Sequence, residues 1–370
     1  MLNALTQTAD LLSMHTSSKQ TLGSPDFTDK QYVSKPFSAL NFKEIVLPKE
    51  NSSCKLAFVD AGNFELLGSS NFSVHLIRGY FSMFGQNKRV VPKNIPQKIE
   101  MFSIAIAKES PQGIAYECSL IPVSQDFGRF FPSKKLVFDS FDETLSARKN
   151  FRANISVIGA AIRRYLEWSI ASVVIEQELD SGDILLRDGA LEASVTGEGD
   201  YSKKAFDSAN AKKVSLCALA KTSALLTTTG IPLVYAVDSI ADSLKMNAPW
   251  IYYPLCENAN PLHPAEIFVA KLHKNSARAF RFEIDKSAAD NEERVMSALS
   301  EISGNSCDAS FIGYPYGLID ADSMSRISVK EAGNYRAMLS SVLEKKGALA
   351  SIQKLSGAID AHDVLNEIIL

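Results

Sequence analysis

The sequence predicts an α/β protein with a mixed β-sheet flanked by helices, and two observations support this class. Before about residue 140, the apolar stretches alternate with polar residues or are rich in β-branched and aromatic side chains, which is typical of strands. After Ser140 the apolar residues recur at steps of three and four, and helical and strand patterns then alternate. Antiparallel strands followed by alternating helices and strands indicate a sheet of mixed direction.

Composition limits the range of functions. The chain has 370 residues, enough for one large domain or two ordinary ones, since domains usually hold roughly 100–200 residues. A net charge of −3 gives no global attraction to nucleic acid, so such binding would depend on local basic patches or on a partner. The five cysteines never occur at CxxC spacing, which argues against a disulfide framework or a zinc site.

No window approaches the ~18 uncharged apolar residues of a membrane span. The N-terminus lacks the pattern of a secretion signal, so we expect a soluble, cytoplasmic protein.

The first long strand carries the first candidate site residue. Residues 1–50 are expected to form an extension of loop and one helix, around Ala4–Met14. The apolar run that begins at Lys55 is expected to end at Asp60, because Ala61-Gly62-Asn63 supplies residues that favour a turn. Further antiparallel strands are expected at Ser73–Phe81, Lys98–Ala107 and Gly113–Pro122.

A long helix is expected to start after Asn150 and to end near Glu178. Glu167 borders the apolar stripe of this helix, where a carboxylate is costly unless it is paired or binds a metal. The alternative is an exposed ion pair with Arg163 or Arg164.

A second strand that ends in a carboxylate follows this helix. The run Asp183–Leu191 places Asp188 at the end of an apolar stretch, directly before Gly189. Asp-Gly after a strand is also a common turn signal, so turn chemistry is the alternative. Two carboxylates at strand ends suggest a hard divalent cation such as Mg²⁺ or Mn²⁺. Lys221, after the buried strand Val214–Ala220, is placed to neutralise their charge or to contact a phosphate, with an exposed loop lysine as the alternative.

The rest of the chain offers one more acidic segment. A helix is expected over Ile319–Ile327 with Asp320 and Asp322 in its first turn, where helix capping accounts for them as well as metal binding does. The C-terminal Gly333–Leu370 is expected to be helical. Other helices are expected at Tyr201–Lys212 and Asn291–Ile302, and other strands at Pro232–Ala236, Trp250–Tyr253, Glu266–Leu272 and Ala279–Ile284.

Five segments of this chain, taken in order, resemble the NurA nuclease family of archaea and some bacteria. They are the motif Val59–Asn63, the helix with Glu167, the Gly-Asp-strand-Asp-Gly segment Gly182–Leu191, the strand end Lys221-Thr222-Ser223, and the Gly-Tyr-Pro segment Gly313–Asp322. Together they cover the chain from Lys55 to Ser328. Each motif alone is weak, whereas all five in the family's order are specific.

The resemblance implies a fold and an activity. NurA proteins have an RNase H-like fold similar to the Piwi domain of Argonaute, so residues 51–330 would form the nuclease domain and residues 331–370 a C-terminal helical segment. Members of the family are Mn²⁺-dependent nucleases that act on single-stranded DNA and on duplex ends, commonly 5′ to 3′, and Mg²⁺ is the alternative ion. They form homodimers that dock on the hexameric HerA translocase for DNA end resection in recombinational repair. We therefore expect a metal-dependent deoxyribonuclease with single-strand endonuclease and 5′–3′ exonuclease activity.

Carried over residue by residue, the resemblance implies that Asp60, Glu167 and Asp188 are the metal carboxylates, and that Lys221 and Asp322 are auxiliary catalytic residues. Two ions roughly 3.5–4 Å apart, bridged by shared carboxylates, would activate water and stabilise the leaving oxygen. The DNA strand would be held mainly through its backbone, a contact that weakens with salt. The expected DNA contacts are Arg163, Arg164 and Tyr314. The two arginines belong to a basic cluster with Arg148, Lys149 and Arg152, for which a solvated helix face is the alternative.

The chain departs from the family pattern at Ala61, Asn63, Gly317 and Asp322, the last being a position often held by His. These departures keep a second hypothesis open, namely a catalytically weak or inactive RNase H-like subunit that binds DNA or a HerA-type ATPase. A third hypothesis, an actin-like ATPase, would require a later Gly-rich adenosine segment, and we see none in the sequence.

Overall fold

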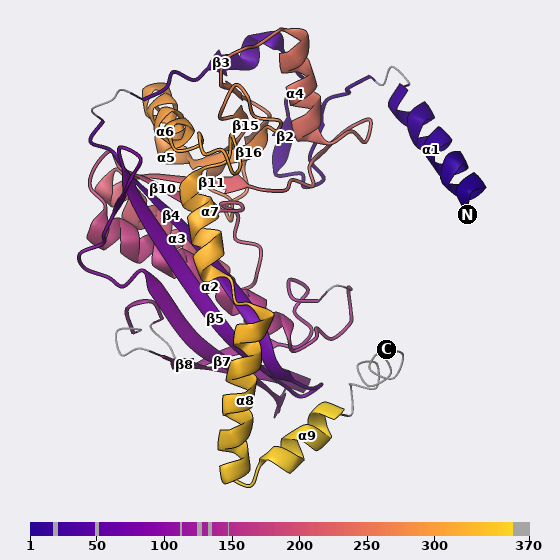
Figure 1. Cartoon of the computed structure of the whole chain (residues 1–370), viewed down its shortest axis with the longest axis vertical. Helices are drawn as coiled ribbons and strands as arrows, with labels where there is room; N and C mark the ends of the chain where they lie inside the picture. Colours follow the sequence, from indigo (N-terminus) through magenta and orange to yellow (C-terminus); the bar gives the residue numbers. More distant parts are fainter. Residues whose placement is uncertain are drawn as a thin grey trace.

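The structure is a computed structural model, and a large mixed sheet runs through it with helices on both faces (Figure 1). The described residues are 1–17, 21–48, 52–111, 113–123, 128–131, 135–146 and 148–357. Within them the main sheet has twelve strands, and β6 (Lys88–Val90) pairs only with β5. The other eleven, in spatial order, are β3 (Phe42–Glu44), β13 (Trp250–Tyr252), β15 (Ala265–Lys271), β16 (Phe280–Asp285), β11 (Ser215–Ala220), β10 (Ile184–Asp188), β4 (Lys55–Gly68), β5 (Phe72–Gly85), β7 (Lys98–Ser110), β8 (Gly113–Pro122) and β9 (Lys135–Asp139).

The helices of the described residues flank this sheet or extend from it. They are α1 (Leu2–Ser17), the 3₁₀ turn η1 (Ala39–Asn41), α2 (Val157–Glu178), α3 (Glu198–Lys212), α4 (Leu233–Ser243), α5 (Lys286–Ala289), α6 (Glu292–Gly304), α7 (Tyr316–Ser325), α8 (Val329–Lys345) and α9 (Leu349–Gly357).

The middle of the sheet has the strand order of the RNase H-like fold. Strand β5 runs antiparallel to both β4 and β7, while β10 pairs in parallel with both β4 and β11. Along the chain these five strands are β4, β5, β7, β10 and β11. Numbered in that way, their spatial order β7-β5-β4-β10-β11 is 3-2-1-4-5. Helix α2 precedes β10 and α3 connects β10 to β11. The predicted α/β class, with an RNase H-like mixed sheet and additional terminal helices, is confirmed.

The two faces of the central strand β4 are covered by different helices. Ala57 and Val59 pack in one core with residues of α2, whereas Leu56 and Phe58 pack in a second core with residues of α7. Alternate residues of a strand point to opposite faces. Asp60 therefore points to the same face as Phe58, toward α7.

Strand β4 does not end at Asp60, so the predicted turn at Ala61-Gly62-Asn63 was wrong. The strand continues to Gly68 and pairs with β5 along this whole stretch. Gly62 is required for another reason: a Cβ added there would lie 2.6 Å from the carbonyl oxygen of Ser325. The glycine therefore lets the end of α7 approach the strand, a role that differs from turn formation.

Most of the other predicted elements are present, and two predictions need correction. Pro232–Ala236 was predicted as a strand, but Leu233 begins helix α4, whose buried residues recur at helical spacing. Helix α7 begins at Tyr316, three residues earlier than predicted, so Asp320 and Asp322 lie beyond its first turn. Capping of the helix N-terminus therefore does not account for these two acids.

Regular secondary structure is present near both ends of the chain. In addition to helix α1, the described residues up to 48 supply three short strands, of which β3 joins the main sheet and the other two form small sheets. These small sheets pair β1 (Pro25–Asp26) with β12 (Leu226–Thr227), and β2 (Tyr32–Ser34) with β14 (Cys256–Asn258). Helices α8 and α9 follow the expected helical pattern, and residues 358–370 lie outside the described part. Across the described residues, we find no helix with the length and apolarity that a membrane span needs.

Candidate metal centre

Three carboxylates from distant parts of the chain converge beside the middle of the sheet. Asp60, Asp188 and Asp322 each offer one oxygen, and these oxygens lie within 4.8 Å of one another. Asp60 is 6% exposed, whereas the other two are partly exposed. The group thus has a buried floor and an opening to solvent.

The register of the sheet explains why these side chains meet. Strands β4 and β10 are parallel neighbours with Val59 opposite Arg187, so the next residues along, Asp60 and Asp188, lie side by side. Both point to the face that α7 covers, and α7 carries Asp322. Two parallel strands and one covering helix therefore position the carboxylates, and such rigid elements hold ligands better than loops do.

Two cations already contact the outer carboxylates. The Lys221 Nζ lies 2.9 Å from Asp188 Oδ2 and 2.7 Å from Asp322 Oδ1, and Arg326 Nη2 lies 2.5 Å from Asp322 Oδ2. Although burial alone would raise the pKa of Asp322, its hydrogen bonds and attraction to Lys221 and Arg326 lower it overall. The hydroxyl of Tyr314 adds a donor to Asp188 Oδ1 at 3.3 Å.

The surroundings of Asp60 raise its pKa, whereas those of Asp322 lower the pKa of that residue. The burial of Asp60, followed by repulsion from Glu167 and Asp188, raises its pKa to about 7, although Lys221 and the backbone of Ala61 act in the other direction. Its Oδ1 accepts a hydrogen bond from the Ala61 N–H at 2.7 Å, and the Ser325 hydroxyl donates to Oδ2 at 3.4 Å. The positive charge of Lys221 therefore does not outweigh the burial of Asp60 and its repulsion by the neighbouring carboxylates.

The donor set fits a hard divalent cation. All three ligand candidates are carboxylate oxygens, which suit Mg²⁺ and Mn²⁺, whereas zinc sites are built mostly from Cys and His. The raised pKa of Asp60 provides the second reason, because a bound cation would offset both the burial and the repulsion that raise this pKa.

Glu167 does not lie in this cluster, although the sequence predicted it as the third metal carboxylate. It is on α2, which covers the opposite face of the sheet, and it is 2% exposed. Both of its oxygens are paired: Oε2 lies 2.6 Å from Arg187 Nη2, and Oε1 accepts from Arg163. The expected pair with Arg163 therefore exists, but it is partly buried rather than exposed. Asp322, predicted as auxiliary, lies where Glu167 was expected.

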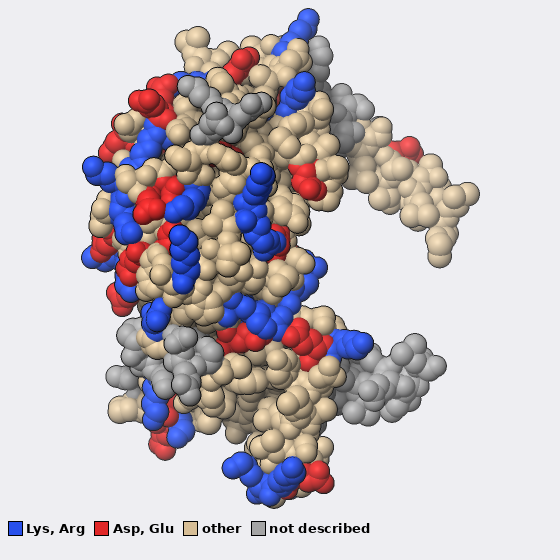
Figure 2. All heavy atoms as spheres, turned by 60° about the vertical axis from the view of Figure 1, so that its left-hand side comes forward, with Lys and Arg blue, Asp and Glu red and all other residues tan. Residues whose placement is uncertain are grey.

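The three expected DNA contacts are engaged inside the protein. Arg163 pairs with Glu167, and Arg164 pairs with Glu198 through Nε, so both charges are compensated. Tyr314 is 1% exposed and its ring stacks on Phe311, which leaves no face on which a base could stack. Over the face in Figure 2, Lys and Arg lie among Asp and Glu and do not form one continuous basic surface.

Sequence reasoning missed three polar partners of the site. Arg187 was overlooked inside an apolar strand, although a charge there requires a buried partner and Glu167 was the available one. Ser325 and Arg326 were also overlooked, although they follow Asp322 by three and four residues. That spacing places side chains on one face of a helix, so the signal was present.

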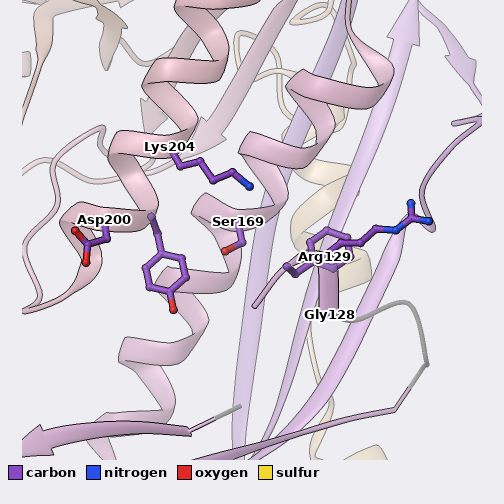
Figure 3. Close-up of a pocket in the computed structure, with 7 residues that line it drawn as sticks. Gly128, Arg129, Ser169, Asp200 and Lys204 are labelled. Carbon is purple, nitrogen blue, oxygen red and sulfur yellow. The ribbon is translucent and has the colours of Figure 1, made fainter. Parts of the chain in front are cut away.

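A separate cavity of about 270 Å³ lies beside α2 and α3 (Figure 3). In this view the Lys204 side chain extends from α3 toward Ser169 on α2, and Arg129 lies on the other side. The lining residues are Gly128, Arg129, Phe130, Ser169, Asp200, Tyr201 and Lys204. None of the three clustered carboxylates is among them, so this cavity is distinct from the candidate metal centre.

Comparison with known proteins finds similar folds but no close relative. No family model matches the chain, and no curated protein matches it. Among solved structures, the chain is similar to the NurA nuclease from Sulfolobus solfataricus, with a TM-score of 0.49 and 15% identity over 93% of this chain and 94% of that one. It is also similar to another NurA structure (TM-score 0.44, 10% identity, 83% and 91% of the two chains). A third is the catalytic domain of human Endonuclease V (TM-score 0.35, 12% identity, 80% and 86%).

Proposed function

We propose that this protein is a metal-dependent DNA nuclease that hydrolyses phosphodiester bonds. The observation that carries the proposal is the convergence of Asp60, Asp188 and Asp322 on one face of an RNase H-like sheet. The order of the five sequence motifs supports DNA as the substrate. Their resemblance to the NurA family also supports Mn²⁺ as the ion, single strands and duplex ends as substrates, and a homodimer that works with a HerA-type ATPase in end resection.

Each residue of the site has a distinct task in this proposal. Asp60, Asp188 and Asp322 would hold the divalent cations, with Asp60, the most buried, as the shared ligand. When bound, the ions would lower the pKa of an attacking water and stabilise charge on the phosphate and the leaving oxygen. Ser325 and the Ala61 N–H fix the orientation of the Asp60 carboxylate.

In this proposal Lys221 has one role before a metal ion binds and another after it binds. In the structure its ammonium bridges Asp188 and Asp322, and it compensates part of their negative charge. A bound cation would take over that compensation, and the ammonium would then be available to the scissile phosphate. Lysine is suited to this role as a mobile point charge on a flexible stem.

The proposal predicts metal-dependent cleavage of single-stranded DNA. With Mn²⁺ and an end-labelled oligonucleotide, we expect cleavage products that disappear when EDTA is added or when Asp60→Ala replaces the wild type. Because the strand would be held through phosphates, cleavage should also fall as salt rises. Gel analysis of the labelled products measures all three effects. Lack of cleavage, or equal cleavage by Asp60→Ala, would contradict the proposal.

One observation favours the alternative of a non-cleaving subunit. Lys221 already compensates two of the three carboxylates without a metal, so the arrangement could persist as a structural ion-pair network. This alternative predicts that the protein binds DNA or a HerA-type ATPase in a pull-down while the same preparation has no metal-dependent turnover.

A further inference from the structure

A buried ion-pair network lies directly behind the carboxylate cluster, on the opposite face of the sheet. We propose that Glu167 is a positioning residue that holds Asp60 and Asp188 in register through two arginines and does not itself bind the metal. This inference rests on the proposed function, because it concerns the same metal centre. Three sets of contacts carry it.

The first set joins Glu167 to the strand that carries Asp188. Glu167 Oε2 lies 2.6 Å from Nη2 of Arg187, the residue immediately before Asp188. The other terminal nitrogen of Arg187 donates to the carbonyl oxygen of Ala190, just past the turn at Gly189. One guanidinium therefore ties together the backbone on both sides of Asp188.

The second set joins Glu167 to the strand that carries Asp60. Glu167 Oε1 pairs with Arg163, and Arg163 Nη1 also donates to the carbonyl oxygen of Ala61 at 3.3 Å. The N–H of Ala61 in turn donates to Asp60 Oδ1 at 2.7 Å. The residue next to Asp60 is thus held by the same carboxylate that holds the residue next to Asp188.

The third set of contacts holds the buried pair of Glu167 and Arg187 in place. Arg187 and Glu167 are each 2% exposed, and the guanidinium of Arg187 lies 4.4 Å from the ring centroid of Trp168. Buried charges of this kind depend on each other, because removal of one partner leaves the other uncompensated. If Glu167 turned toward the other face, both arginines would lose the carboxylate that compensates their charge.

Positioning and direct ligation make opposite predictions for Arg187→Met. If Glu167 positions the ligands, Arg187→Met and Glu167→Gln should each weaken Mn²⁺ binding about 10–100-fold, as losses of supporting hydrogen bonds around metal ligands do. The double variant should then be no weaker than the single ones, because both changes break the same link. If Glu167 is a ligand, Arg187→Met frees its carboxylate and should leave Mn²⁺ binding unchanged or tighter.

The experiment is a calorimetric Mn²⁺ titration of the full chain, wild type and variants, using preparations with a cooperative thermal unfolding transition. Arg164→Met is the matched control, since Arg164 is on the same helix, pairs with the buried Glu198 and donates to the carbonyl of Glu192. It should lower the unfolding temperature and leave Mn²⁺ affinity within about twofold. Arg187→Lys, which keeps the charge, serves if Arg187→Met does not fold, and it should bind Mn²⁺ with intermediate affinity.

The outcomes separate this inference from the proposed function. Weaker binding by Glu167→Gln and by the Arg187 variants, without further loss in the double variant, supports the positioning role. Wild-type affinity in the Arg187 variants, or in Glu167→Gln, overturns it and leaves the nuclease proposal intact. If the wild type itself takes up no Mn²⁺, the proposed metal centre fails at the first titration.

Discussion

Replacing Asp60 with asparagine should reduce DNA cleavage by on the order of 10³-fold and should greatly weaken Mn²⁺ binding. The expected loss follows from the several kcal/mol of charge stabilisation that a catalytic metal supplies, at about 1.4 kcal/mol for each factor of ten. The change removes the most buried of the three carboxylates, and asparagine keeps nearly the same shape. Rates of cleavage of end-labelled single-stranded DNA, with Mn²⁺ in excess, measure the effect.

The same variant should be more stable than the wild type when metal is absent. The pKa of Asp60 is raised to about 7 in the folded protein, above the ordinary value of 3.8, so ionisation of this group opposes folding. The wild type should therefore lose stability as pH rises from about 4 to 7, by roughly 1.4 kcal/mol per pH unit at most. Asparagine removes this contribution, since it does not ionise.

Thermal unfolding in EDTA at pH 5 and pH 8 provides the check. We expect Asp60→Asn to unfold at a higher temperature than the wild type at pH 8, with a smaller difference at pH 5. A variant that loses activity and also unfolds earlier at pH 8 would mean that Asp60 has a structural role, contrary to a metal-binding one.

Replacing Asp322 with asparagine should weaken Mn²⁺ binding by more than the roughly 10–100-fold that follows loss of a supporting contact, and cleavage should fall with it. Asp322 supplies the third oxygen of the cluster, a position that the sequence motifs had assigned to Glu167. Its loss leaves two carboxylates and releases Lys221 and Arg326 from one of their partners. Calorimetry with Mn²⁺ and cleavage assays on the same preparation measure the two effects.

Asp320 provides a matched control on the same helix. Its side chain is also partly buried and pairs with Arg89 at 2.5 Å, but it does not belong to the carboxylate cluster. Asp320→Asn should cost a modest amount of stability and leave Mn²⁺ affinity unchanged. Equal losses of Mn²⁺ affinity in Asp320→Asn and Asp322→Asn would show that the helix is merely disturbed and would argue against Asp322 as a ligand.

Much of the fold could be predicted from local patterns, because most strands and helices have clear periodicity. Strand β10, for example, ends at Asp188 as predicted, since Gly189 adopts the positive φ of +98° that a turn requires. The end of β4 could not be predicted in this way. Gly62 is a turn signal when read locally, whereas its actual role depends on Ser325, which lies far away in the sequence.

Only part of the candidate site could be predicted from the sequence. The pattern indicated Asp60 and Asp188 as candidate metal ligands on two strands, and the parallel pairing of β4 with β10 brings them together. The choice between Glu167 and Asp322 depends on which face of the sheet each helix covers. That is a property of tertiary packing, and helical periodicity in a single sequence does not contain it.

Tyr314 illustrates the same limit. Tyr314 was expected to contact DNA, but its ring is buried and its hydroxyl donates to Asp188. Helix α4 was missed for a simpler reason. Five apolar residues, Pro232–Ala236, are too few to separate a buried strand from the first turn of a helix.

The most direct test of the metal centre is anomalous diffraction from crystals of the full chain soaked in Mn²⁺. We predict a manganese peak among the carboxylates of Asp60, Asp188 and Asp322, with the Lys221 ammonium displaced from its bridge and Glu167 still paired with Arg187. A cluster without a peak at saturating Mn²⁺, or a peak coordinated by Glu167, would contradict this account.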